Sequence, residues 1–364
     1  MNFYTLPKSL SDLDHFRSNP MIQFKEETVD GVEVCIPVYM ISTPELWREP
    51  YALELRGHVY DKATGQLISA ALPKFFNANE NAWTQMHDLP WDEIHNIADK
   101  RDGSMITFAV INEKVYAKTK KSFYSDVAIE AQKYLDETVK GQELAAHIKI
   151  MISMNQSPIF EFFHPEWQIV LNYGTEPVMT YLGYRDMIDG SWNPSKRSDL
   201  SVDDEMILSD IIGWQETATN VEGVVVTFKD GRITKLKTSW YLQQHHVRTD
   251  MRERDIAELA ALEKLDDIKS VVVESGMDIS LIENIENRVA KTIVDIKTIV
   301  ETCSAGGKKM GLCAKEMAMH FGCHPYFRMI MQDYRGQEVD YVDYFLKNHL
   351  KQDFGLKCVY NTKF

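Results

Sequence analysis

Long apolar runs are missing from this chain of 364 residues. No stretch approaches the roughly 18 apolar residues that a membrane-spanning helix needs, so no membrane partner is expected. The amino terminus, MNFYTLPKSLSDLDHF, lacks the basic segment followed by an apolar stretch that is typical of a secretory leader. Hydrophobic residues nevertheless make up 44% of the chain and charged residues 26%, which indicates a globular protein with a real core. We expect a cytoplasmic protein.

Cysteine is scarce and its spacing fits no disulfide framework. The five cysteines are odd in number and widely separated, which favours a reducing compartment. Three of them, together with two nearby histidines, could suggest zinc: Cys303, Cys313, Cys323, His320 and His324. Because these cysteines are ten residues apart rather than arranged as C-x-x-C, no zinc site is predicted.

Positively charged residues are also fewer than negatively charged ones: 40 Lys and Arg against 54 Asp and Glu give a formal net charge of −14. This value excludes a general electrostatic attraction of the whole surface to nucleic acid, but it leaves room for a local basic groove. Residues 305–364 contain nine Lys/Arg against six Asp/Glu, so the acidic excess lies elsewhere.

The pattern of residues divides the chain into two parts, without internal repeats or low-complexity tracts. Up to about residue 245 most segments are strand-like, and turn residues are frequent. Predicted strands cover 33–41, 51–61, 157–164 and 167–173, with hairpins around Asn112-Glu113 and Asp230-Gly231 and one helix over 125–150. From about residue 248 apolar residues recur at helical spacing, as at Ile282, Ile285, Val289, Ile293, Ile296 and Val300. We therefore predict an α+β protein, with a domain of antiparallel sheets over 1–247 and an all-α domain over 248–364.

Lys100 stands in DKRDGS, at the start of an apolar strand. An Asp-Gly turn flanked by charged residues is common at protein surfaces, so a simple turn is one interpretation. The other interpretation is that Lys100 is a nucleophile.

Charged residues interrupt several other strands. Glu161 stands inside PIFEFF, where a buried carboxylate needs a cation or hydrogen-bond donors, and Glu222 precedes a glycine that permits close approach. Lys235 and Lys237 are two residues apart on a strand and therefore project from one face. Lys118 and Lys120 repeat this arrangement. Each feature alone is compatible with a solvated strand face or a structural ion pair.

Taken in order, these residues resemble the motif series of the covalent nucleotidyltransferases, the superfamily of ATP-dependent ligases and mRNA capping enzymes. KRDGS matches the K-x-D-G nucleophile motif, FEF the central glutamate motif, VEGVV the E-G motif, and KLK the closing K-x-K. ALELRGHVYD, KFFNANEN and KTSWY narrow the resemblance to the single-strand RNA ligase family of T-even bacteriophages. Arg101 occupies the variable slot of K-x-D-G, where an acidic residue is expected in the nearest relative.

The resemblance implies a fold and a set of roles. An adenylyltransferase domain would carry Lys100 as the nucleophile that forms lysyl-AMP from ATP, with Asp102 and Gly103 shaping the turn that aims it. A lysine attacks only when neutral, and nearby cations disfavour its protonated form. The remaining implied residues contact the nucleotide, its phosphates or Mg²⁺: Arg56 and Lys74 for the β- and γ-phosphates, Phe76 near the nucleotide, Lys118 and Lys120 on a phosphate-contacting strand, Glu161 for the ribose hydroxyls, Glu222 for Mg²⁺ directly or through water, Gly223 beside the nucleotide, and Lys235 and Lys237 for the α-phosphate.

By the same resemblance, AMP moves from Lys100 to a 5′-phosphate on RNA, and a 3′-hydroxyl then seals the strand. The implied partners are single-stranded RNA ends, including a nicked tRNA anticodon loop repaired during phage infection. DNA ligases and capping enzymes share the first motifs but usually continue into an OB-fold barrel, whereas this chain turns helical. A non-catalytic RNA-binding protein on a ligase scaffold is the alternative from another class. No association helix stands out, so we expect a monomer.

Overall fold

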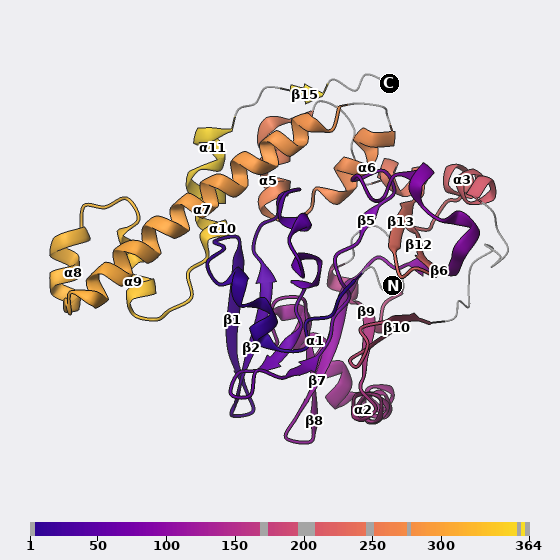
Figure 1. The fold of residues 1–364 in the computed structure, drawn as a ribbon, viewed down its shortest axis with the longest axis horizontal. Helices are drawn as coiled ribbons and strands as arrows, with labels where there is room; N and C mark the ends of the chain where they lie inside the picture. Colours follow the sequence, from indigo (N-terminus) through magenta and orange to yellow (C-terminus); the bar gives the residue numbers. More distant parts are fainter. Residues whose placement is uncertain are drawn as a thin grey trace. The chain divides into compact units, whose positions relative to one another are not determined.

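The computed structural model describes residues 4–167, 174–195, 208–244, 251–274, 278–354 and 358–360 (Figure 1). The chain forms two compact units. The first comprises Met1–Met40, Glu45–Val247 and Asp266–Met277, and the second Ile41–Pro44, Arg248–Leu265 and Asp278–Phe364. The predicted α+β class, with antiparallel sheets followed by a helical region, is confirmed.

Two of the sheets in the first unit pack face to face. One has the order β1-β2-β3-β4 and comprises Ile22–Val29, Val32–Tyr39, Val59–Asp61 and Leu67–Ser69. The other has the order β11-β10-β9-β7-β8 and comprises Trp192–Pro194, Val178–Asp186, Gln156–Phe163, Ser104–Ile111 and Lys114–Lys118. Ala109 and Ile111 of β7 join Val34 and Ile36 of β2 in one buried cluster between them.

Alternation along β7 and β9 creates a second core on the opposite face. Phe108, Phe160 and Phe162 pack against α1 (Asp126–Glu137) and α2 (Val139–Ser153). Since successive side chains in a strand point to opposite faces, Glu161 is directed away from these helices.

The third sheet has the order β5-β13-β12-β6 and carries most of the predicted site residues. Its strands are Phe76–Asn77, Ile233–Lys237, Gly223–Phe228 and Ile94–Lys100. One face is a buried cluster that includes Val224, Val226 and Leu236. The helices α3 (Leu208–Thr217), α4 (Ser239–Gln244) and α6 (Asp266–Glu274) complete the first unit.

Several predicted elements differ from the observed ones. The helix expected over 125–150 is two helices, because Thr138 caps α2 by accepting a hydrogen bond from the amide of Gly141, 2.9 Å away. The strand expected over 51–61 is reduced to β3, since Tyr51 and Gly57 have φ values of 64° and 94° that interrupt extended backbone. The strand expected over 167–173 falls mainly outside the described residues. Short 3₁₀ helices cover Leu10–Phe16, Leu46–Arg48, Ala52–Glu54, Met86–Asp88, Trp91–Glu93 and Pro165–Trp167.

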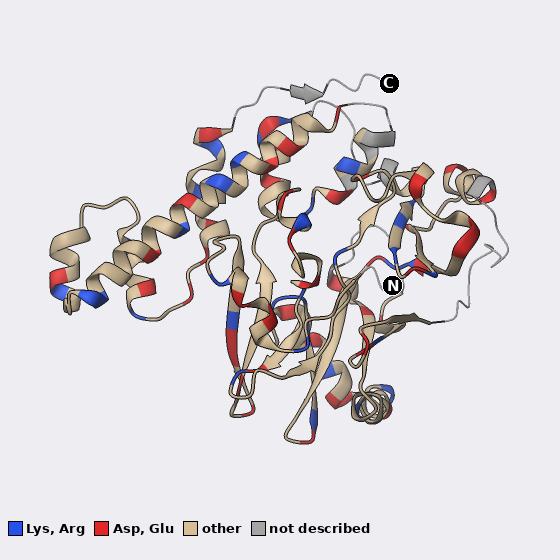
Figure 2. Ribbon diagram, in the orientation of Figure 1, with Lys and Arg blue, Asp and Glu red and all other residues tan. Residues whose placement is uncertain are grey.

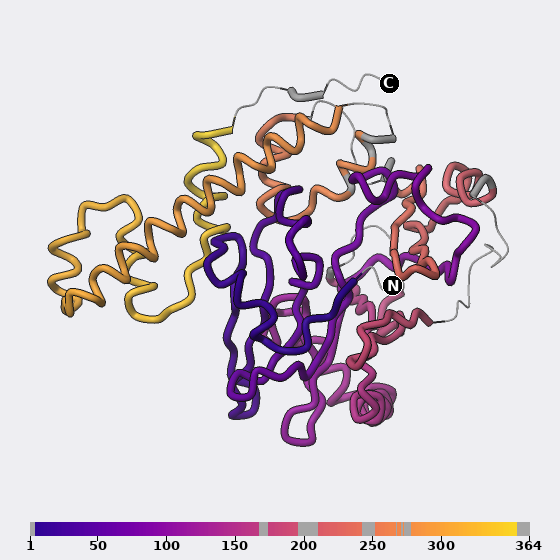
Figure 3. The backbone as a smooth tube through the Cα atoms, viewed as in Figure 1, coloured from indigo at the N-terminus to yellow at the C-terminus, as the bar shows by residue number. Residues whose placement is uncertain are grey.

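The second unit is built on the long helix α7, which the tube in Figure 3 follows from Ser280 to Lys309. The apolar residues predicted at helical spacing are buried along one side of it, as expected. The other elements are α5 (Glu253–Ala261), α8 (Ala314–Phe321), α9 (Phe327–Tyr334), α10 (Tyr341–Asn348), α11 (Leu350–Asp353), β14 (Met251–Arg252) and β15 (Cys358–Tyr360). The antiparallel pair β14–β15 was not predicted in a domain expected to be all-α. Within the described residues, no helix is both long and apolar enough to cross a membrane.

Candidate active site

The register of the third sheet aligns three motifs that are far apart in the sequence. Gly223 of β12 lies opposite Lys100 of β6 on one side and opposite Lys237 of β13 on the other. Glycine is needed here, because a Cβ at residue 223 would lie 2.0 Å from the carbonyl oxygen of Leu236. The K-x-D-G lysine, the E-G motif and the K-x-K motif therefore meet at one end of this sheet.

Glu222 contacts both Lys100 and Lys237. Its Oε1 lies 2.7 Å from Nζ of Lys100 and 3.0 Å from Nζ of Lys237. The Glu222 side chain is only 2% exposed, and its Oε2 has no hydrogen-bond partner among the described residues. A buried carboxylate oxygen without a partner is costly and indicates that a cation or water belongs there.

Glu161 approaches Lys100 from the neighbouring sheet. Burial raises the pKa of its carboxyl to about 7, with a smaller contribution from Glu222, while Lys100 acts in the opposite direction. Gly103 joins β6 to β7 at this point. A Cβ at Gly103 would lie 2.7 Å from the carbonyl oxygen of Phe162 in β9, so the close approach of this turn to β9 requires glycine.

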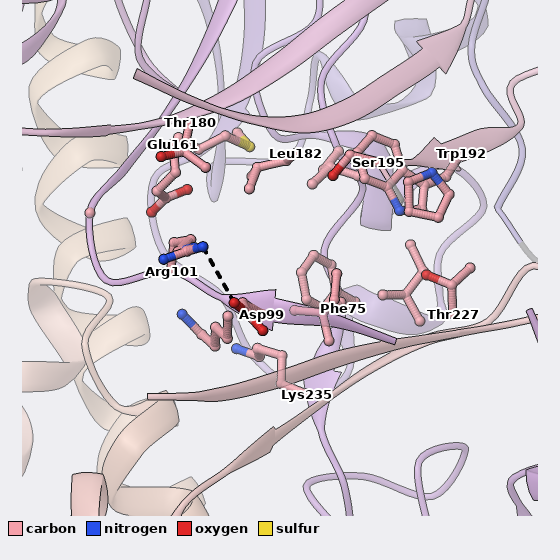
Figure 4. Close-up of a pocket in the computed structure, with 18 of the residues that line it drawn as sticks. Phe75, Asp99, Arg101, Glu161, Thr180, Leu182, Trp192, Ser195, Thr227 and Lys235 are labelled. Atoms are coloured by element: carbon pink, nitrogen blue, oxygen red, sulfur yellow. Dashed lines mark ion pairs between the residues drawn. The ribbon is translucent and has the colours of Figure 1, made fainter. Parts of the chain in front are cut away.

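Lys100, Gly103 and Glu161 line a cavity of about 320 Å³, whose described lining does not include Glu222 or Lys237. Its charged lining includes Arg56, Lys100, Glu161, Lys235 and Asp266. Figure 4 shows Glu161 on one side and Lys235 on the other. Trp192 and Thr227 lie at the less polar end (Figure 4). The volume lies within the range of small-molecule sites.

Comparison with known proteins identifies the family. The family model described as RNA ligase matches residues 54–243, which is more than half of the chain and includes every charged residue of the cavity lining except Asp266. The chain belongs to the RNA ligase family. The resemblance seen in the motifs is thereby confirmed, and the protein is an enzyme.

The individual proteins to which this RNA ligase is similar have low sequence identity to it. A protein named "Putative RNA ligase" from Thermovibrio ammonificans is 25% identical over 314 residues, which covers 80% of this chain and 77% of that one. A structure named "Putative ATP-dependent DNA ligase from Aquifex aeolicus" is 10% identical with a TM-score of 0.45, covering 91% of this chain and 100% of that one. An archaeal ATP-dependent RNA ligase structure is 12% identical with a TM-score of 0.42, covering 81% of this chain and 79% of that one.

Asp266 lines the candidate site and was missed by sequence reasoning. Its carboxylate lies between two lysines, with Oδ2 3.0 Å from Nζ of Lys74 and 3.0 Å from Nζ of Lys235. Although burial opposes it, these two lysines hold the pKa of Asp266 well below its usual range. Burial lowers the pKa of Lys235, and Asp266 acts against this. Asp266 lies beyond the matched segment, in a run typical of an ordinary helix face, so no local signal distinguishes it.

The region upstream of Lys100 contributes both expected and unexpected side chains. Arg56 lines the cavity, and its buried Nε has no hydrogen-bond partner among the described residues. Phe75 lines the cavity, whereas Phe76 is 4% exposed and packs edge-on against Trp47 and Trp83. An aromatic near the nucleotide is expected at residue 76. In the structure, Phe75 lines the cavity and Phe76 begins β5.

The paired lysines of the β8 region do not share one environment. Lys118 is completely buried and donates hydrogen bonds to Oγ1 of Thr107 at 3.2 Å and to the carbonyl oxygen of Thr119 at 2.9 Å. Burial lowers its pKa to about 7. Lys120 places Nζ 3.5 Å from the ring centroid of Tyr39. Neither lysine lines the cavity in the described part of the chain.

The turn that follows Lys100 is held by Tyr241. Asp102 is 3% exposed and accepts a hydrogen bond of 3.2 Å from the hydroxyl of Tyr241. Nζ of Lys237 lies 5.0 Å from the centroid of the same Tyr241 ring. KTSWY was part of the family resemblance, but no role was predicted for Tyr241. At the rim, Arg101 pairs with Asp99 at 3.3 Å, as the dashed line in Figure 4 marks.

Proposed function

We propose that this ligase uses ATP to join 5′-phosphate and 3′-hydroxyl ends of single-stranded RNA through a lysyl-AMP on Lys100. The observation that carries the proposal is the contact between Lys100 and Glu222 at the edge of a cavity lined by Glu161 and Lys235. A lysine held beside carboxylates and further cations is suited to phosphoryl transfer, in which positioning and charge neutralisation supply most of the catalysis.

In the first step, the lone pair of neutral Lys100 Nζ attacks the α-phosphorus of ATP. The bond to the bridging oxygen breaks, pyrophosphate leaves with the electron pair, and Nζ loses one proton to solvent to give the phosphoramidate. Lys235 and Lys237 would neutralise charge on the α-phosphate, while Arg56 and Lys74 would hold the β- and γ-phosphates. Asp266 occupies Lys74 and Lys235 in the ligand-free protein, so its carboxylate has to give way to the phosphates.

In the later steps, an oxygen of the RNA 5′-phosphate attacks the phosphorus of lysyl-AMP, and Lys100 leaves with a proton. The RNA 3′-hydroxyl then attacks the adenylylated end, and AMP is released. Glu161 would accept hydrogen bonds from the ribose hydroxyls, and Asp102, held by Tyr241, would keep the Lys100 turn in place. Gly223 keeps the backbone beside Lys100 free of side-chain atoms.

Mg²⁺ fits the carboxylate of Glu222. Its Oε2 is a buried oxygen without a partner among the described residues, and carboxylate oxygen is the ligand type that Mg²⁺ prefers, with water completing the shell. When bound, Mg²⁺ would neutralise phosphate charge. No group of three or more His, Cys, Asp and Glu side chains that could form an all-protein metal cage occurs in the described residues. We therefore expect a metal that is shared with the phosphates.

The test is covalent labelling. The protein is incubated with α-labelled ATP and Mg²⁺ after pyrophosphate treatment to remove any bound AMP, and denaturing electrophoresis follows. We expect label on the wild type, its release onto 5′-phosphorylated RNA, and none on Lys100→Ala. Lys114→Ala is the matched control, because Lys114 is half-exposed on β8 and does not line the cavity. Unlabelled wild type, with GTP also inactive, would favour the non-catalytic RNA-binding alternative.

The natural substrate we propose is a nicked tRNA anticodon loop, repaired in the cytoplasm of a phage-infected cell by a monomeric enzyme. The proposal rests on the resemblance to the phage enzymes. The expected result is faster sealing of a nicked anticodon stem-loop than of an unstructured RNA, and little sealing of DNA ends. Equal rates on the two RNAs would contradict it. Truncation at residue 247 is not a clean test, since it would also remove Asp266 from the first unit.

A further inference from the structure

A second hollow, separate from the candidate active site, lies within the helical unit. It has a volume of about 450 Å³ and is bounded by α8 and α9. Two alanines of α8 form one wall, and α9 with the turn after it supplies Phe327, Arg328, Gln332, Arg335 and Gln337. The described lining contains no carboxylate.

The walls of this hollow are fixed by their packing. Gly307 of α7 lets α8 approach closely, since a Cβ there would lie 2.1 Å from Sδ of the buried Met317. The hydroxyl of Tyr334 donates a hydrogen bond to the carbonyl oxygen of Leu312, which ties the end of α9 to the loop before α8. The hollow is therefore formed before any ligand binds.

The turn after α9 places the two glutamines together. Gly336 has a φ of 70°, which suits glycine, and reverses the chain. The amide of Gln337 then donates a 3.0 Å hydrogen bond to the carbonyl oxygen of Gln332. Two amide side chains are thereby brought beside the arginines that flank them.

Arg328 and Arg335 are exposed, and neither guanidinium forms an ion pair or hydrogen bond with the residues that the structure describes. The surrounding segment 308–337 contains five Lys/Arg and two Asp/Glu, a balance of +3 in a chain of net charge −14. Figure 2 shows Lys and Arg at this end of the helical unit. Two unpaired guanidinium groups at a concave site suit an anion that accepts bidentate hydrogen bonds.

We infer that the hollow between α8 and α9 binds the single-stranded RNA substrate, with Arg328 and Arg335 on backbone phosphates and one unstacked nucleotide between them. RNA is recognised through splayed bases held by aromatic, arginine and amide side chains. Phe327, Gln332 and Gln337 supply the aromatic ring and the amides beside the two guanidinium groups. The inference rests on the proposed function for the identity of the ligand. An acidic peptide is the alternative anion, and the experiment separates the two.

The experiment measures binding of a labelled 12-nucleotide single-stranded RNA to the full-length protein by fluorescence anisotropy at several salt concentrations. Arg328→Ala/Arg335→Ala is compared with wild type. We expect roughly tenfold weaker binding at moderate salt. The slope of log affinity against log salt should become shallower by about 0.7 for each phosphate no longer neutralised, or about 1.4 for the pair. Formation of lysyl-AMP should be unchanged, because neither arginine belongs to the first unit.

The control variant is Lys291→Ala/Lys347→Ala, which removes the same charge from side chains of the same unit that are 75% and 70% exposed. The control variant should have the same salt dependence as wild type. Arg328→Lys/Arg335→Lys should recover the salt dependence that the alanine pair loses. Unchanged binding in the alanine pair, or an equal loss in the control pair, would overturn the inference. The inference would also be overturned if polyglutamate displaced the labelled RNA as effectively as unlabelled RNA does.

Failure of this inference can be distinguished from failure of the proposed function. If wild type seals RNA and the alanine pair binds RNA normally, only the RNA site is wrong. If wild type is never labelled by ATP, but the alanine pair binds RNA more weakly than wild type, the RNA site is supported and the ligase mechanism is wrong.

Discussion

Nζ of Lys100 lies 2.7 Å from Oε1 of Glu222, a distance typical of a charge-assisted hydrogen bond. The same Oε1 lies 3.0 Å from Nζ of Lys237, so one carboxylate oxygen holds both lysines in the ligand-free protein. If Lys100 attacks ATP as proposed, its contact with Glu222 has to be exchanged for others when ATP binds.

Glu222→Gln removes the negative charge that Lys100 and Lys237 share. We expect lysyl-AMP formation to fall by about 100-fold or more, because the neutral amide oxygen holds the two lysines and a cation much less strongly than the carboxylate does. Single-turnover labelling with α-labelled ATP measures the rate. Glu143→Gln, an exposed glutamate of α2, serves as control. A Glu222→Gln enzyme as fast as the control would show that the carboxylate has no part in the first step.

Asp266→Asn leaves Lys74 and Lys235 without the carboxylate between them. The Asp266 side chain is 32% exposed, so the loss should be smaller than the about 3–5 kcal/mol typical of a fully buried pair, but the free energy of unfolding should still fall. Pyrophosphate can replace the lost negative charge. We therefore expect a larger pyrophosphate-induced rise in melting temperature for Asp266→Asn than for wild type, measured by differential scanning fluorimetry.

Asp295→Asn is the control for this prediction, because Asp295 pairs with Lys291 on the exposed side of α7. Its response to pyrophosphate should match that of wild type. An Asp266→Asn response no larger than this one would mean that the Asp266 carboxylate does not compete with phosphate for the two lysines.

Features confined to one strand could be predicted from the sequence. Alternation alone predicts that Lys235 and Lys237 share one face of a strand. The observed β13 confirms this, since Leu236 between them lies in the buried cluster on the opposite face.

Features that depend on tertiary contacts could not be predicted. Asp266 is 192 residues from Lys74 in the sequence, and nothing in its helical run indicates an approach to the site. Which of Phe75 and Phe76 faces the cavity depends on how β5 pairs with β13, because a strand of two residues is too short to show an alternation of apolar and polar side chains. The break between α1 and α2 requires Gly141 to lie against the backbone of Tyr134, a contact of the folded chain.

Glu161 should make stability depend on pH. Burial raises its pKa to about 7 in the native state, so between about pH 4.5 and 7 the native protein binds more protons than the unfolded chain. The free energy of unfolding therefore falls as pH rises through this window, by on the order of 3 kcal/mol. In Glu161→Gln this decline should disappear. Urea unfolding at pH 5 and pH 7.5 measures it, and equal declines in variant and wild type would contradict the prediction.

A buried ion pair lies beneath the segment that carries Arg56. Arg185 and Glu54 are each 1% exposed and are joined by hydrogen bonds of 2.7 and 3.2 Å. His58 contacts the same carboxylate at 3.0 Å, and its Nδ1 accepts a hydrogen bond from the amide of Ala71, so Nε2–H is the donor to Glu54.

Glu54→Gln should destabilise the protein by about 3–5 kcal/mol, because the Arg185 charge would remain buried without its counter-ion. The exposed Glu49→Gln should change stability by less than about 0.5 kcal/mol. Urea unfolding at pH 7 compares the two variants with wild type. Similar stabilities for both variants would show that the pair contributes little.

Lys118 should give the opposite pH dependence to Glu161. Burial lowers its pKa to about 7 in the native protein, whereas an unfolded lysine stays protonated to about pH 10.4. Between these values the unfolded chain binds more protons, so the free energy of unfolding rises with pH. Lys118→Met should flatten this rise between pH 7 and 9.5, and the exposed Lys114→Met on the same strand should not. A rise of equal size in Lys118→Met would mean that Lys118 keeps its proton in the folded protein.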